Sequence, residues 1–185
     1  MPDGAHKGSF VQAYNAQIAV DSEAQIIVAA EITQDCNDKQ QLAPMFEQVE
    51  KNTGAKPVAG SADNGYWASE QVADKRVEGI DLHVATGRDK HGTSEQIASS
   101  ADPDKAATTL EHMKQKLQTD AGRAIYKMRK AIVEPVFGQI KECRHFRRFS
   151  FRGLENVKAE WKLVCLTHNI LKLFRSGRGF QAAAA

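Results

Sequence analysis

Two carboxylates stand at positions where their side chains could do chemistry. Asp63 lies in the stretch "ADNGYW", directly after the apolar run of a predicted short buried strand. Open α/β sheets bind their ligands at the carboxyl ends of strands, so Asp63 is a candidate site residue. The alternative, to which we give equal weight, is that Asp63 only caps the turn that follows it.

Glu134 is the second candidate, and positive charge surrounds it. It lies in "YKMRKAIVEPVFGQIKECRHFRRF", a stretch that is predicted to be largely helical. Glu134 is eight residues after Tyr126 and seven before Lys141, which places the three side chains on roughly one helix face. The alternative is a solvated acid on a charged helix. Apolar neighbours at positions 132, 133, 136 and 137 disfavour that alternative, because they predict a packed segment.

The charge of the chain is unevenly distributed. The formal net charge is +2, but residues 1–120 carry −8 and residues 121–185 carry +10. A basic C-terminal third indicates a polyanionic partner, most plausibly nucleic acid, although a basic face can also serve only solubility. In "CRHFRRFSFRG" the arginines alternate with phenylalanines. This pattern is typical of a segment that binds a DNA backbone, and also of a loop whose phenylalanines close the core. These arginines are Arg144, Arg147, Arg148 and Arg152.

The order of elements that must position these residues predicts an α/β fold. "NAQIAV" and "AQIIVAAEIT" form a hairpin with Asp21 at its turn, and a helix follows, capped by Asn37 or Asp38 and ended by Gly54. After the Asp63 strand come a short helix and the strand "DLHVAT". This alternation favours a partly parallel sheet in one domain that covers residues 1–185.

The C-terminal part is predicted to be helical and basic over residues 120–175. Residues 87–119 precede it as an inserted polar loop that ends in a short helix. One long helix covers roughly residues 120–143, and a second begins at Leu154. The second carries an apolar seam in which His168 is predicted to be packed and hydrogen-bonded rather than a ligand. The seam consists of Val157, Trp161, Val164, His168, Leu171 and Phe174.

The remaining composition favours a cytoplasmic protein. Three separated cysteines without a Cys-x-x-Cys pair predict no disulfide framework and no zinc site. No apolar run approaches the ~20 residues that cross a bilayer, so no membrane partner is expected.

Taken together, these stretches carry a resemblance to a known family. The chain resembles the catalytic domain of bacterial insertion-sequence DDE transposases, a ribonuclease-H-like family. The matching stretches are "YNAQIAVDSEAQIIVAAEITQDCNDKQQL", "ADNGYW", and "YKMRKAIVEPVFGQIK" followed by "FRRFSFRGLENVKAEWKLVCLTHNILKL". The family's Tyr-x2-Arg-x3-Glu-x6-Lys signature is similar to Tyr126, Arg129, Glu134 and Lys141. The spacing from Arg129 to Glu134 is one residue too long, so either Arg129 or Lys130 fills the basic position.

The resemblance implies an activity, a cofactor and a partner. An Asp-Asp-Glu set would bind two Mg²⁺ (or Mn²⁺) ions about 4 Å apart, with Asp63 as the second carboxylate and Glu134 as the third. The metals would activate water or a DNA 3′-hydroxyl and stabilise the leaving oxygen. Double-stranded DNA would be the partner, and the intact enzyme would act as a homodimer. The DNA-binding residues would be Tyr126, Arg129, Lys130, Lys141, Arg144, Arg147, Arg148 and Arg152.

The first carboxylate of the set is not matched convincingly. The family carries it on a strand before the hairpin, and the candidates here are Asp3 and Asp21. We therefore expect a truncated transposase that lacks the first strand of its mixed sheet. The hairpin and the Asp63 strand would then pair directly or leave backbone groups unpaired, at roughly 1–3 kcal/mol each if buried. Two rivals remain: a non-catalytic DNA-binding remnant, and a helical module whose basic face binds an acidic protein.

Overall fold

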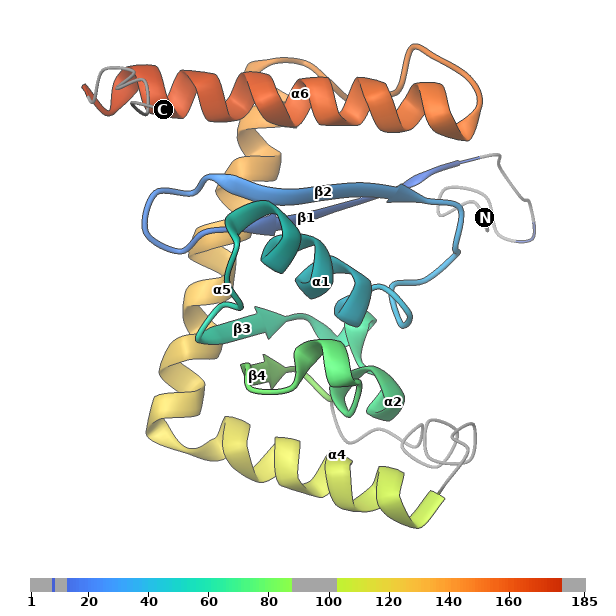
Figure 1. The fold of residues 1–185 in the computed structure, drawn as a ribbon, viewed down its shortest axis with the longest axis vertical. Coiled ribbons are helices and arrows are strands. Elements are labelled where there is room, and N and C mark those ends of the chain that lie inside the picture. Colours follow the sequence, from blue (N-terminus) through green and yellow to red (C-terminus); the bar gives the residue numbers. More distant parts are fainter. Residues whose placement is uncertain (1–7, 9–12, 88–102, 178–185) are drawn as a thin grey trace.

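Strands and helices alternate along the chain, and the strands form two separate two-stranded sheets (Figure 1). The computed structural model describes residue 8, residues 13–87 and residues 103–177, with side chains from residue 107 in the last range. β1 (Asn15–Val20) pairs antiparallel with β2 (Ile27–Thr33), and β3 (Ala59–Ala62) pairs parallel with β4 (Asp81–Val84). The mixed α/β character is confirmed. The two sheets do not join into one mixed sheet, and a cavity lies between β1 and β3.

The predicted hairpin is present, with Asp21 at its turn. The Asp21 carboxylate accepts hydrogen bonds from the backbone N–H groups of Glu23 and Ala24, at 3.1 and 2.7 Å. Gln25 completes the turn with a positive φ of 57°. Its side chain then contacts both C-terminal helices, as described below.

The first helix, α1 (Leu42–Thr53), ends as predicted at Gly54, whose φ of 78° suits glycine. The predicted cap is wrong: Gln41 occupies the N-cap position without a side-chain hydrogen bond, and Asp38 contacts β1 instead.

The prediction of a buried Asp63 strand is also wrong, because the residues of β3 are half-buried or exposed. Val58, just before β3, is 87% exposed. β3 has a neighbouring strand on only one side among the described residues, which explains this exposure.

Short elements connect β3 to β4. They are a 3₁₀ turn (Asn64–Tyr66), α2 (Ser69–Val72) and a second 3₁₀ turn (Lys75–Val77). The short helix expected at the end of the polar loop is in fact the 16-residue α4 (Pro103–Gln118). Leu110, Met113 and Leu117 of α4 pack on the core around β4, and this packing outweighs the polar composition. Residues 88–102 of the expected loop lie outside the described residues.

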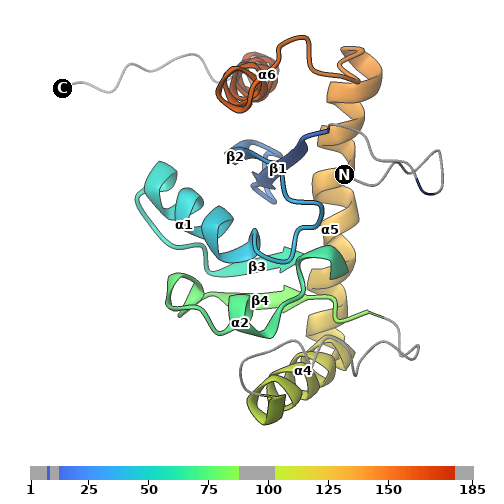
Figure 2. The ribbon, with the colours of Figure 1, turned by 90° about the vertical axis from the view of Figure 1, so that its right-hand side faces the viewer.

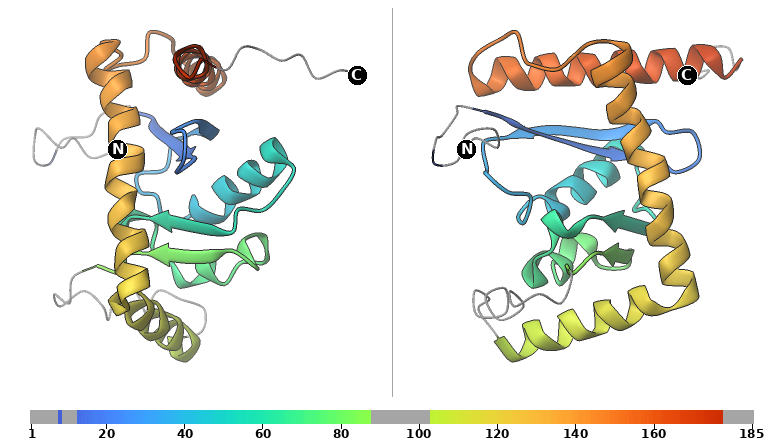
Figure 3. Two further views of the ribbon diagram at one scale, coloured as in Figure 1. Left: turned by 90° about the vertical axis from the view of Figure 1, so that its left-hand side faces the viewer. Right: turned by 180° about the vertical axis from the view of Figure 1, so that it is seen from behind.

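Two long helices follow, as predicted. α5 (Asp120–Gly138) continues into a π-helical turn (Gln139–Cys143), and α6 is Leu154–Arg175. α5 passes along both sheets, contacting β1, β3 and β4 (Figure 3), while α1 lies on the opposite side of the strands (Figure 2). In the α6 seam Val157, Trp161 and His168 are buried, as expected. The prediction that Phe174 belongs to this seam is wrong, because Phe174 is 79% exposed.

Candidate functional site

Asp63 lies at the carboxyl end of β3 and also caps the turn that follows. One carboxylate oxygen, Oδ1, accepts a hydrogen bond from the Gly65 N–H at 2.9 Å. The other, Oδ2, faces the guanidinium of Arg129, with Nη1 3.7 Å away. Both roles that the sequence left open are therefore combined in one side chain.

Arg129 is the basic signature residue that points at this carboxylate. Its side chain is only 16% exposed, its guanidinium lies 5.5 Å from the ring centre of Tyr126, and its Nε has no hydrogen-bond partner in the described structure. Lys130, the alternative at the strict spacing, is exposed. Of the two, Arg129 is the residue that the fold brings to Asp63.

A second carboxylate, Asp38, lies beside Asp63 and was not recognised as a site residue from the sequence. Asp38 Oδ1 accepts hydrogen bonds from the side-chain amides of Asn15 (2.5 Å) and Gln17 (2.6 Å) on β1. A Cβ atom at Gly65 would lie 3.1 Å from both Asp38 Oδ2 and Asp63 Oδ1. Two carboxylate oxygens thus flank a glycine that has no side chain to separate them.

Tyr66 connects this carboxylate pair to the hairpin. Its hydroxyl donates to Gln17 Oε1. Burial raises the pKa of Tyr66 well above its usual range, and the negative charges of Asp38 and Asp63 raise it further. The hydroxyl therefore keeps its proton as a hydrogen-bond donor. Polar side chains at Asn15 and Gln17, inside an apolar strand, were the sequence signal that could have revealed this network.

Glu134 does not lie on the same side of α5 as Arg129. It follows Arg129 by five residues, about 140° around the helix, and its side chain is exposed. The neighbouring Pro135 has no N–H for the carbonyl of Ala131. Gln25 of the hairpin turn supplies a replacement, donating from Nε2 to Ala131 O at 3.0 Å, while its Oε1 accepts from Lys172 Nζ at 2.7 Å.

The predicted DNA-binding residues differ in how far they are free to contact a partner. The Arg144 guanidinium donates to Thr167, to Oγ1 at 2.8 Å and to the carbonyl at 3.1 Å, and Arg147 pairs with Glu142. Lys141 lies over the Phe137 ring, 5.2 Å from its centre. Three further predicted residues are exposed: Lys130, Arg148 and Arg152.

The phenylalanines between these arginines serve the core more than the surface. Phe146 and Phe149 pack against each other and against Trp161, with ring centres 5.5 to 6.4 Å apart. Phe151 is 60% exposed. The prediction that this segment both closes the core and offers an exposed surface is consistent with this division.

The other candidates for the first carboxylate do not join the pair. Asp21 follows the end of β1, which runs opposite to β3, so Asp21 and Asp63 lie at opposite ends of the two strands (Figure 1). Asp3 lies outside the described residues. Within the part of the chain that the structure describes, no three His, Cys, Asp or Glu side chains are grouped closely enough to hold a metal ion. The described residues therefore do not fit a two-metal centre on their own.

Comparison with known proteins finds a similarity in the C-terminal part. Residues 86–174 match the family model of the transposase DDE domain. This match supports a DDE transposase. The matched region contains all of α4, α5 and the basic segment up to Phe174, and it therefore includes Arg129 and Glu134. No curated protein and no solved structure matches the chain.

No helix among the described residues has the length and apolar character to cross a bilayer.

Proposed function

We propose that the chain acts in DNA transposition, in a transposase of the insertion-sequence type. The activity would be metal-dependent phosphodiester cleavage at the element ends followed by strand transfer into target DNA. The observation that carries the proposal is the contact of Arg129 with Asp63, since it joins the region that matches the DDE domain to the carboxylate that follows β3. A ribonuclease-H-like arrangement would place these groups at one sheet edge.

The described residues limit what the chain can do alone. Asp38 and Asp63 are adjacent, but Glu134 is exposed on another side of α5 and completes no group of three. Cleavage would therefore need a further carboxylate, or a movement that brings Glu134 to the pair. This arrangement favours a second candidate, a DNA-binding protein that retains the basic helices without cutting.

Two assays on one protein separate these candidates. The first measures binding to labelled duplex DNA over a range of salt, because contacts between basic residues and phosphates weaken steeply as salt rises. The second measures nicking of supercoiled plasmid with Mn²⁺ or Mg²⁺. Asp63→Asn and Glu134→Gln are the test variants, and Glu155→Gln, at an exposed glutamate of α6, is the matched control.

Each outcome decides between the readings. Nicking that is lost in both test variants and kept in the control supports the transposase. Salt-dependent binding without nicking supports the DNA-binding protein. Absence of salt-dependent binding rejects both, and an acidic protein partner then becomes the better explanation of the basic face.

A further inference from the structure

Phe151 is an exposed aromatic residue in the loop that precedes α6. Residues 144–153 form this loop, which connects the π-helical turn to the first residue of α6 (Figure 1). Two other phenylalanines of the loop, Phe146 and Phe149, pack on Trp161 of α6. Phe151 is 60% exposed and makes no ring contact with another aromatic side chain of the described residues. The core therefore uses two of the three phenylalanines and leaves the third on the surface.

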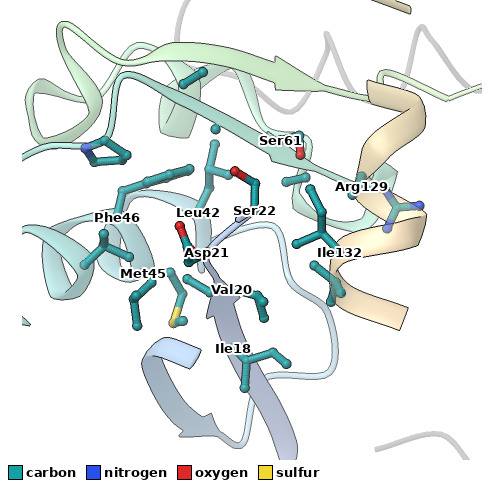
Figure 4. A pocket seen from close by; sticks show the side chains of 18 of the residues that line it. Ile18, Val20, Asp21, Ser22, Leu42, Met45, Phe46, Ser61, Arg129 and Ile132 are labelled. Carbon is teal, nitrogen blue, oxygen red and sulfur yellow. The ribbon is translucent and has the colours of Figure 1, made fainter. Parts of the chain in front are cut away.

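Phe151 lies outside the candidate site described above. The cavity between the two sheets is lined by side chains that include Ile132 and Arg129, the residue that contacts Asp63 (Figure 4). Phe151 does not line this cavity. A role of the Phe151 ring would therefore be separate from the carboxylates that follow β3.

Hydrogen bonds hold the backbone around Phe151 in place. The N–H groups of Ser150 and Phe151 both donate to the carboxylate of Glu160 on α6, to Oε1 at 2.9 Å and to Oε2 at 3.2 Å. The N–H of Gly153 donates to the hydroxyl of Tyr14 at 3.1 Å. A side chain on a loop that is already ordered loses less conformational entropy when it binds a ligand. The loop thus presents the Phe151 ring in a defined position.

Two exposed arginines lie close to this ring in the sequence. Arg148 precedes Phe151 by three residues and Arg152 follows it directly. Within the part of the chain that the structure describes, neither guanidinium pairs with a carboxylate. Three residues of extended chain span at most about 10 Å, so both arginines can contact a ligand that touches the ring. Exposed aromatic rings among free cations are typical of surfaces that bind unpaired nucleotides, with phosphates on the cations and bases on the rings.

We propose that Phe151 stacks on an unpaired base of DNA while Arg148 and Arg152 bind the adjacent phosphates. This inference rests on the proposed function and adds to it a preference for DNA that contains an unpaired base. In a fully paired duplex the neighbouring bases cover each other's faces, so the ring has no free face to contact. An unpaired base has an open face, and stacking on an aromatic side chain tolerates any base.

The charge of the loop favours DNA over a second copy of this chain as the partner of Phe151. A symmetric contact between two copies brings the same surface of each together. It would place Arg148 and Arg152 of one copy near the same arginines of the other, and like charges in contact are unfavourable. Phosphates would neutralise both arginines instead.

The test compares three duplexes that carry a fluorescent label. The first is fully paired, the second contains one unpaired adenine, and the third has an abasic residue in place of that adenine. The second and third carry the same number of phosphates, so the ratio of their affinities reports on the base. Fluorescence anisotropy measures each affinity at several salt concentrations. The affinities themselves should fall as salt rises, whereas this ratio should stay nearly constant.

A matched set of variants assigns the effect to the ring. Phe151→Ala removes the ring, and Phe151→Trp replaces it with a larger aromatic surface. Phe174→Ala is the control, because it removes another exposed phenylalanine that lies on α6. Circular dichroism of each variant verifies that it is folded.

The parent protein should bind the duplex with the unpaired adenine at least about fivefold more tightly than the abasic duplex. Phe151→Ala should abolish this preference and keep salt-dependent binding to the fully paired duplex. Phe151→Trp and Phe174→Ala should both retain the preference.

The outcomes separate a failure of this inference from a failure of the proposed function. If the protein binds all three duplexes in a salt-dependent way without a preference, or if Phe151→Ala keeps the preference, only the stacking role is overturned. Absence of salt-dependent binding to every duplex would reject the proposed function and the stacking role together. A dimer, seen by sedimentation, that Phe151→Ala dissociates would also overturn the stacking role, because a second copy would then cover the ring.

Discussion

The guanidinium of Arg129 lies 3.7 Å from the carboxylate of Asp63, although 66 residues separate them in the chain. This contact joins α5 to the carboxyl end of β3. We predict that Arg129→Ala lowers the free energy of unfolding by roughly 1–3 kcal/mol, since it removes a largely buried side chain and leaves Asp63 without its cation. Urea denaturation measures this change.

Lys130→Ala is the control for that prediction, since Lys130 is an exposed neighbour on the same helix. Its effect on stability should stay within about 0.5 kcal/mol. Equal losses in the two variants would show that Arg129 has no special structural role.

Gly60 allows the ring of Phe46 to lie directly on β3. A Cβ atom at position 60 would overlap this ring, with Cε1 only 2.6 Å away. Phe46 also lines the cavity, so Gly60→Ala should push the ring into that space. We predict a loss of stability of about 1 kcal/mol, which urea denaturation measures.

The matched change for this prediction is Gly138→Ala, because no atom lies near a Cβ at that helical position. It should keep the stability or raise it slightly, since alanine favours a helix more than glycine does. A Gly60→Ala protein as stable as the parent would contradict the close contact of the Phe46 ring with β3.

Arg148 and Arg152 are exposed, whereas Arg144 is held by Thr167. If the first two bind phosphates, the double variant Arg148→Ala, Arg152→Ala should lower the slope of log affinity against log salt by about 2. Its stability should change little. Arg144→Ala should instead destabilise the packing of the π-helical turn on α6, with a smaller change in the slope. Identical slopes for the double variant and the parent would exclude these two arginines from the DNA contact.

His168 makes stability depend on pH. It is buried, and Nε2 lies 3.1 Å from the carbonyl of Gln25. Burial chiefly lowers the pKa of His168, and the nearby charges of Arg144 and Lys172 lower it further. Protonation therefore favours the unfolded state, in which histidine has its ordinary pKa of about 6.5.

We predict that the free energy of unfolding contributed by His168 is intact above about pH 6.5 and decreases as the pH falls towards the lower folded-state pKa. His168→Gln, which keeps a donor for Gln25, should flatten the stability profile in this range. Denaturation at a series of pH values measures the profile. An unchanged slope in the variant would assign the pH dependence to other groups.

Local patterns predicted the parts of the fold that depend on local interactions. The hairpin, the end of α1 at Gly54 and the two long C-terminal helices follow from β-branched runs, a left-handed cap and helical periodicity. His168 was also assigned correctly as a packed residue, because it lay on the apolar seam of α6.

Features that depend on distant contacts could not be predicted in the same way. Asp38 was expected to cap α1 because of its position before the helix, but the amides of Asn15 and Gln17 hold it beside Asp63. The length of α4 was underestimated, because its sequence is mostly polar and only a few of its side chains pack on the core around β4. The separation of β1 from β3 was one of two outcomes left open, because local sequence carries no signal for the pairing of distant strands.

The hairpin is held mainly by the end of the chain. Asn169 on α6 accepts from the N–H of Ile27 at 2.9 Å and donates to its carbonyl at 2.8 Å, across 142 residues of sequence. An isolated hairpin is only marginally stable. On a ribosome that adds about 5–20 residues per second, these strands would wait on the order of ten seconds or more before their helix emerges. Newly made chains would expose the apolar residues of β1 and β2 during that interval, which makes translation speed and chaperones relevant to how much protein folds.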